Sequence, residues 1–69
     1  MKIKVVQFGL GKIGLEITRL VLERERFKLI GAVDKDEDKI GRDISDLLNL
    51  ESTTGVLVTD NQKKVLSEV

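Results

Sequence analysis

The segment Gly9-Leu10-Gly11-Lys12-Ile13-Gly14 has the residue types and the spacing needed to receive an anion on bare backbone. It follows an apolar run and precedes a stretch with helical periodicity, so its three glycines fall where a strand turns into a helix. The first glycine of such a turn allows a sharp change of direction, the second leaves room for phosphates, and the third lets the helix lie close to the strand. The first N–H groups of the helix would then face a dinucleotide pyrophosphate.

An acid, Asp34, stands twenty positions after Gly14, at the end of a second apolar run. At this place an acid accepts hydrogen bonds from the adenosine ribose hydroxyls and repels a 2′-phosphate. The cation of Lys35 would offset that repulsion, so we predict NAD as the preferred cofactor, with NADP tolerated. Lys12, inside the turn, either adds positive charge near the phosphates or points to solvent, and the second is the preferred interpretation. The candidate cofactor-binding residues are Gly9, Leu10, Gly11, Lys12, Ile13, Gly14, Asp34 and Lys35.

The first half of the chain reads as strand, helix and strand. Residues 3–8 and 27–33 are apolar runs without clean alternation, which is typical of strands covered on both faces in a parallel sheet. Residues 12–26 predict a helix, whose expected core stripe consists of Ile13, Ile17, Leu20 and Val21. Leu15 and Leu22 fall on the opposite side, where they are either scattered surface leucines or a second contact surface for a partner or for further chain.

The second half repeats the alternation. Residues 34–39 are charged and predict a solvated loop, and Asp43 can act as the N-cap of a short helix whose apolar stripe is Ile44, Leu47 and Leu48. Residues 56–58 predict a third strand. Asp60 can act as the N-cap of a last helix that carries Val65, Leu66 and Val69.

This βαβαβα order predicts an α/β fold, the Rossmann-like first half of a doubly wound parallel sheet with strand order 3-2-1. The first strand would then have a free apolar edge, which natural domains rarely tolerate. We therefore expect residues 1–69 to be an incomplete dinucleotide-binding domain from the N-terminal part of a longer protein, without its substrate domain. The other expectation is a homo-oligomer that completes the sheet through this edge.

The composition argues against several classes of partner and site. Twelve basic and twelve acidic residues cancel, which gives no electrostatic reason to expect a nucleic-acid or membrane-surface partner. The chain has no Cys and no His, so we predict no metal site and no disulfide, and we expect a soluble cytoplasmic protein. The remaining titratable residues form no constellation suited to proton transfer, so no catalytic residue is assigned.

Four segments together resemble the N-terminal domain of the dihydrodipicolinate reductase superfamily: VVQFGLGKIG (5–14), GAVD (31–34), IGRDISDLL (40–48) and GVLVTD (55–60). The glycine turn is shared by many dehydrogenases, and residues 41–60 discriminate better. The resemblance is greatest to the diaminopentanoate dehydrogenase branch, because reductases proper usually carry a glycine loop one residue longer. It implies a parent enzyme that transfers a hydride between NAD(P) and a diamino acid or related imine, with its substrate site further along the chain.

Two other interpretations remain open. One is a regulatory NAD-sensing module, such as those attached to ion transporters, which shares the glycine turn and the acid but catalyses nothing. The other is an inert truncated piece of an enzyme. A substrate domain encoded after residue 69 would favour the enzyme, and a transporter encoded alongside would favour the sensor.

Overall fold

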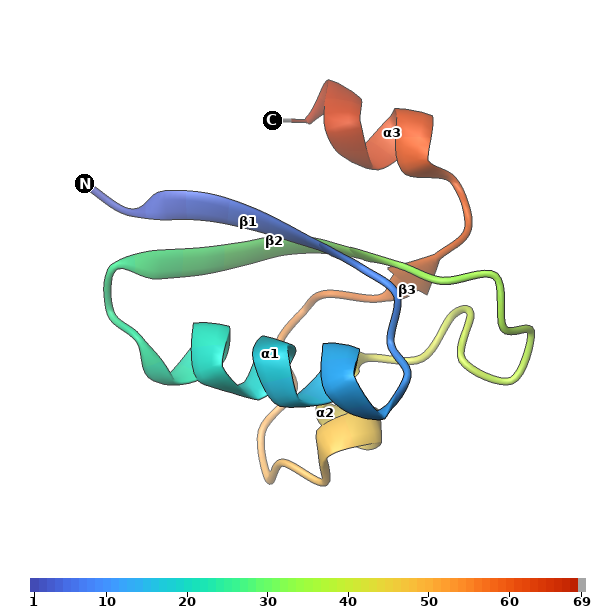
Figure 1. Cartoon of the computed structure of the whole chain (residues 1–69), viewed down its shortest axis with the longest axis horizontal. Coiled ribbons are helices and arrows are strands. Elements are labelled where there is room, and N and C mark those ends of the chain that lie inside the picture. The colour runs from blue at the N-terminus through green and yellow to red at the C-terminus, as the bar shows by residue number, and fades with distance from the viewer. Residues whose placement is uncertain (69) are drawn as a thin grey trace.

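The sheet has three parallel strands in the order expected from the sequence. The structure is a computed structural model that describes residues 1–68, with β1 at Ile3–Phe8, β2 at Phe27–Val33 and β3 at Val58–Thr59. β2 lies between β1 and β3, and both pairings are parallel (Figure 1). The predicted Rossmann-like half-fold with strand order 3-2-1 is therefore confirmed.

Helices cover both faces of this sheet. α1 (Lys12–Glu23) and α2 (Ile44–Leu48) lie on one face, and α3 (Gln62–Ser67) lies on the other (Figure 1). α1 ends three residues before the predicted boundary, because Arg24 is extended and accepts a turn hydrogen bond from Phe27 N–H at 3.2 Å. All three predicted helices are present, and each follows a strand in the expected order.

The predicted core stripe of α1 is wrong at three of its four positions. Ile13 is 73% exposed, Ile17 45% and Leu20 52%, and only Val21 is buried. The face that meets the sheet is centred instead on Gly14, Thr18 and Val21, at i, i+4 and i+7. Thr18 is fully buried, and its hydroxyl is satisfied there because it donates to the Gly14 carbonyl oxygen at 2.8 Å.

The apolar residues of α1 thus flank a line of smaller ones. On one flank Leu15 packs against the core, whereas Leu22 remains exposed. On the other flank, Ile13 and Ile17 lie beside Phe8 at the end of β1 and border a common hollow. The prediction of an amphipathic helix was right, but the wrong face was assigned to the core. Small residues occupy the face where helix and sheet come closest, and they give no apolar signal in the sequence.

The third strand begins two residues later than predicted and ends one residue later. Val58 and Thr59 pair with β2, but Val56 accepts a hydrogen bond from Ile44 N–H at 3.0 Å, and Leu57 forms an antiparallel bridge with Asp43. The segment before α2 therefore covers the outer edge of β3. β1 has a partner strand on one side only within residues 1–68, so the free edge lies where it was predicted.

Asp43 joins the segments before and after α2. Its Oδ1 accepts from Ser45 N–H at 2.8 Å, which confirms the predicted N-cap, and also from the N–H and hydroxyl of Thr54 at 3.0 and 2.7 Å. Its Oδ2 accepts from Gly55 N–H at 2.9 Å. Burial alone would raise the pKa of the Asp43 carboxyl, but the hydrogen bonds from Ser45 and Thr54 outweigh it and hold that pKa far below its ordinary value.

The predicted cap of the last helix is wrong by one residue. Asn61, not Asp60, is the N-cap of α3, and its side-chain oxygen accepts from Lys64 N–H at 3.0 Å. Either residue type suits an N-cap, so sequence alone does not separate the two positions. Within α3, Val65 is buried and Leu66 is exposed, whereas Val69 lies outside the described residues.

The apolar stripe of α2 is as predicted: Ile44 and Leu48 are buried, and Leu47 packs on the core.

We predict that Asp43→Ala lowers the free energy of unfolding by roughly 2–3 kcal/mol, because it removes an N-cap and the acceptor that holds Thr54 and Gly55. Urea unfolding at neutral pH measures this. The folded-state pKa lies below the unfolded value near 3.8, so the stabilisation is present above that pH and is lost as pH falls below it. Asp43→Ala should therefore flatten the stability curve in acid.

Asp60→Ala is the matched control, because Asp60 is an exposed aspartate one residue before the cap of α3. Its unfolding free energy should stay within about 0.5 kcal/mol of the wild type. Equal effects of the two substitutions would contradict the assignment of these hydrogen bonds to Asp43.

Candidate functional site

The turn between β1 and α1 presents bare backbone. Gly9 has a φ of +88°, a conformation that favours glycine, and it redirects the chain after Phe8. The N-cap Gly11 has no capping side chain, and the first turn of α1 contains no acid. α2 and α3 are both capped by their own side chains. The first N–H groups of α1, the longest helix among the described residues, therefore remain available to an anion.

Gly14 sets how closely α1 approaches the turn. A Cβ at Gly14 would overlap the Gly9 carbonyl oxygen and would lie 2.9 Å from the Gly9 carbonyl carbon. The side-chain amide of Gln7 donates to the same carbonyl oxygen at 3.3 Å. A Cβ at Gly11, by contrast, would meet no atom within 4 Å. Gly14 is thus required by the fold itself, whereas the space above Gly11 is open.

Leu10 connects the turn to the acid at the end of β2. Its side chain is fully buried in the core, so only its backbone belongs to the turn. Leu10 N–H donates to Asp34 Oδ2 at 2.7 Å, and Asp36 N–H donates to Asp34 Oδ1 at 2.9 Å. The two regions that the sequence proposed as one site are therefore joined directly, through residues 24 positions apart.

The Asp34 carboxyl is held in its charged form. The hydrogen bond from Asp36 N–H, followed by that from Leu10 N–H, lowers the pKa of Asp34 below its ordinary value, and the Lys39 ammonium adds to this effect while partial burial opposes it. Each carboxylate oxygen accepts one backbone hydrogen bond and keeps a second lone pair. Asp34 can therefore accept two further hydrogen bonds from a ligand.

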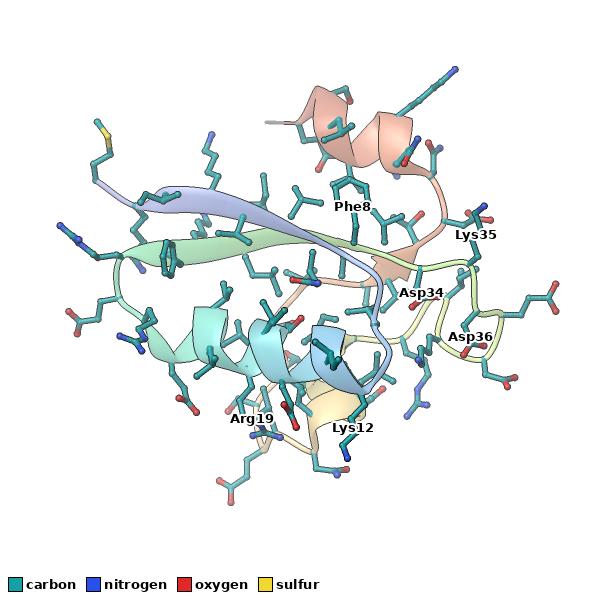
Figure 2. All side chains as sticks on the ribbon, viewed as in Figure 1. Phe8, Lys12, Arg19, Asp34, Lys35 and Asp36 are labelled. Atoms are coloured by element: carbon teal, nitrogen blue, oxygen red, sulfur yellow. The ribbon has the colours of Figure 1, made fainter. Side chains whose placement is uncertain are left out.

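A hollow of about 330 Å³ opens beside Asp34. Figure 2 shows Phe8, Asp34 and Lys35 at the end of the sheet where β1 and β2 finish, and Phe8 and Val33 supply an apolar wall there. Gln62 of α3 also lines this hollow. Its apolar wall and acidic rim suit a flat base carried on a ribose.

The remaining predicted residues differ in their placement. The side chains of Lys12 and Ile13 are exposed, so these residues would contribute to a ligand site chiefly through their backbone N–H groups. Lys12 extends away from the sheet, as expected (Figure 2). Lys35 is exposed and borders the hollow with Asp34. The structure thus brings the glycine turn, Asp34 and Lys35 together at one end of the sheet.

Three residues at the site were not predicted. Gln7 holds the Gly9 carbonyl, Phe8 lines the hollow, and Lys39 donates to the Leu10 carbonyl oxygen at 2.8 Å. The polar Gln7 within an apolar strand was a usable signal. No pattern in the sequence indicates that Lys39, in a charged loop, folds back over 29 positions.

Features elsewhere in residues 1–68 do not point to a further ligand site. A hollow of about 400 Å³ between α3 and β3 contacts none of the predicted site residues. Among residues 1–68, no three acidic side chains lie close enough to hold a metal ion. Nor does any helix in that range have the length and apolar character needed to cross a membrane.

A parallel sheet of strand order 3-2-1, an uncapped glycine turn and an acid after the second strand define a Rossmann-type dinucleotide-binding unit. The chain belongs to the family of dihydrodipicolinate reductase N-terminal domains, whose model matches residues 1–69. Within this family the domain is the NAD(P)-binding part of an oxidoreductase.

A curated relative gives the same assignment. The chain is 37% identical over 46 residues to a 4-hydroxy-tetrahydrodipicolinate reductase of Prochlorococcus marinus (strain NATL2A). The matched segment covers 67% of this chain and 16% of that enzyme, so the chain spans only a small part of its relative's length.

We predict that Gly14→Ala lowers the free energy of unfolding by about 1–3 kcal/mol, because the new methyl group forces α1 away from Gly9. Gly11→Ala is the matched control: its φ of −70° suits alanine and its Cβ meets no neighbour, so only the N-cap preference for glycine is lost, which costs less than about 1 kcal/mol. Urea unfolding of both variants measures the difference. Equal stabilities would show that α1 does not depend on this close approach.

Proposed function

We propose that this chain is the NAD(P)-binding N-terminal part of an oxidoreductase that transfers a hydride between a nicotinamide cofactor and a diamino acid or related imine. The observation that supports this most strongly is the direct hydrogen bond between the uncapped turn and Asp34, at 2.7 Å. It places an anion site directly beside a charged ribose acceptor, and a dinucleotide needs both of these groups. We place the substrate domain in further chain, since the matched segment amounts to 16% of the relative.

In this proposal each part of the dinucleotide has its own group of residues. The pyrophosphate lies over Gly11 and accepts from the first N–H groups of α1. The ribose hydroxyls donate to Asp34, and the adenine lies in the hollow against Phe8 and Val33. When bound, the cofactor supplies the hydride chemistry. The chain itself binds and orients the cofactor, and none of residues 1–68 is assigned a proton-transfer role.

Two resemblances favour two different substrates for the parent enzyme. The relative's name is that of a 4-hydroxy-tetrahydrodipicolinate reductase, which favours reduction of a cyclic imine-type substrate. The six-residue glycine turn, Gly9 to Gly14, favours the diaminopentanoate dehydrogenase branch. In both reactions a hydride passes between a nicotinamide and a carbon atom bonded to nitrogen in a diamino acid or its imine. Activity of the full-length parent on each substrate distinguishes them.

The free edge of β1 would bind a further strand. Beside it, α1 carries three exposed apolar side chains, Ile13, Ile17 and Leu20, of which the first two border a hollow at the end of β1. A neighbouring strand would satisfy the backbone groups of β1, and an element packed against it would cover these side chains. We propose that this element is further chain of the parent enzyme, or a second copy in a homo-oligomer.

Fluorescence titration with NADH tests the cofactor site. The wild-type chain should show saturable binding, and Gly11→Ala should weaken it at least tenfold, because a Cβ there occupies the phosphate position without disturbing the fold. Asp34→Ala should weaken NADH binding by about tenfold or more through loss of hydrogen bonds to a charged acceptor. Unchanged affinity in both variants would refute the site. Binding without hydride transfer by the full-length parent would favour an NAD-sensing module.

Lys35→Met tests the cofactor preference. We expect the wild type to bind NADH more tightly than NADPH, because the Asp34 carboxylate repels a 2′-phosphate. Removing Lys35 should weaken NADPH several-fold and leave NADH nearly unchanged, since this exposed ammonium borders the hollow. Lys63→Met, an exposed lysine on α3, is the control and should change neither affinity. Tighter binding of NADPH by the wild type would overturn the predicted preference.

A further inference from the structure

Lys39 lies in the loop after β2, but its side chain folds back onto the glycine turn. Its ammonium donates to the Leu10 carbonyl oxygen at 2.8 Å and stands 3.7 Å from Asp36 Oδ2. The side chain is 23% exposed, unusually low for a lysine in a charged loop. Leu10 is thus held at both ends of its backbone, with its N–H on Asp34 and its carbonyl on Lys39.

These contacts close a ring between the glycine turn and residues 34–39 after β2, here called the acid loop. Asp36 N–H donates to Asp34 Oδ1, and Lys39 N–H donates to the Asp36 carbonyl oxygen at 2.9 Å. The chain of contacts therefore runs from Asp34 to Leu10, from Leu10 to Lys39, and through Asp36 back to Asp34. Without the Lys39 contact, the turn is held to the end of β2 by two hydrogen bonds, from Leu10 N–H to Asp34 Oδ2 and from Gly9 N–H to the Val33 carbonyl oxygen at 2.8 Å.

The Leu10 carbonyl shares a peptide group with Gly11 N–H. In a planar trans peptide these two groups point in opposite directions, so fixing one fixes the other. Lys39 holds the carbonyl from the side of the acid loop, and Gly11 N–H has no hydrogen-bond partner within residues 1–68. Together with Asp34, which holds Leu10 N–H, the Lys39 ammonium therefore fixes the direction of the Gly11 N–H.

We propose that Lys39 is a positioning residue for the dinucleotide site, aiming the Leu10–Gly11 peptide at the pyrophosphate while fixing the turn at a set separation from Asp34. This inference rests on the proposed function. Its physical basis is preorganisation: donors that are already oriented cost less to order when a ligand binds. In this proposal Lys39 acts through Leu10, to which its ammonium donates, and not through a contact with the ligand.

The test compares NADH and NADPH affinities of Lys39→Met, Lys39→Arg and Lys35→Met with those of the wild-type chain. Lys39→Met should weaken both dinucleotides by about tenfold and leave their ratio unchanged. Lys39→Arg, which keeps a charged donor of sufficient reach, should restore binding to within about threefold. Lys35→Met removes a neighbouring charge of the same sign and should change the ratio instead.

Amide NMR of the ligand-free chains supplies a readout that a purely structural role would not give. In Lys39→Met the Gly11 amide signal should shift, while the signals of Leu29 and Ala32 in the core of β2 stay in place. Lys39→Gln, a polar variant whose amide is one bond shorter, should reproduce both the affinity loss and the Gly11 shift.

The outcomes separate the two proposals. If the wild type binds NADH but Lys39→Met binds it within twofold as tightly, the positioning role is wrong and the proposed function stands. If Lys39→Met and Lys39→Gln both fail to fold, Lys39 supports the fold and the positioning role is likewise overturned. If the wild type binds neither dinucleotide, the proposed function fails, and this inference fails with it.

Discussion

The close approach of α1 to the Gly9 carbonyl is the contact on which the rest of the arrangement depends. It is possible only because residue 14 carries no side chain. Once the helix lies this close, the residues facing the sheet must be small or able to satisfy themselves, as the buried Thr18 does through the Gly14 carbonyl. The larger side chains are displaced to the two flanks. The helix start also comes to lie over the end of β1, beside Asp34.

The Asp34 carboxylate serves the fold and the proposed ligand with the same atoms. Two backbone N–H groups keep it ionised and oriented, and the lone pairs they leave unused are those a ribose would need. Asp43 provides a contrast within the same chain. Four hydrogen bonds from three residues occupy its carboxylate, so it closes a loop and has less capacity left for a ligand. Two aspartates of the same chain therefore differ in role according to how many hydrogen-bond donors the fold already supplies to each.

The sequence was sufficient for the strand order and for the joining of the turn to Asp34, because both follow from element order and fixed spacing. It was insufficient where the decisive residues are small or distant. Gly14 and Thr18 carry no apolar signal, so the stripe of Ile13, Ile17 and Leu20 was assigned to the core. Adjacent residues of similar type made Asp60 and Asn61 interchangeable as caps. Lys39 could not be assigned, because its partner lies 29 residues away.

The hydrogen bonds that build the site join residues 24 and 29 positions apart, and they link the segment after β1 to the segment after β2. The site therefore cannot form in any short segment on its own, and it exists only once the central pairing of the sheet has formed. Any dinucleotide that selects this geometry binds the folded chain and not the unfolded one, so its binding free energy is added to the stability of the whole domain. For a chain of this size, with a small core and marginal stability, occupancy by cofactor would also set how long the domain survives proteolysis.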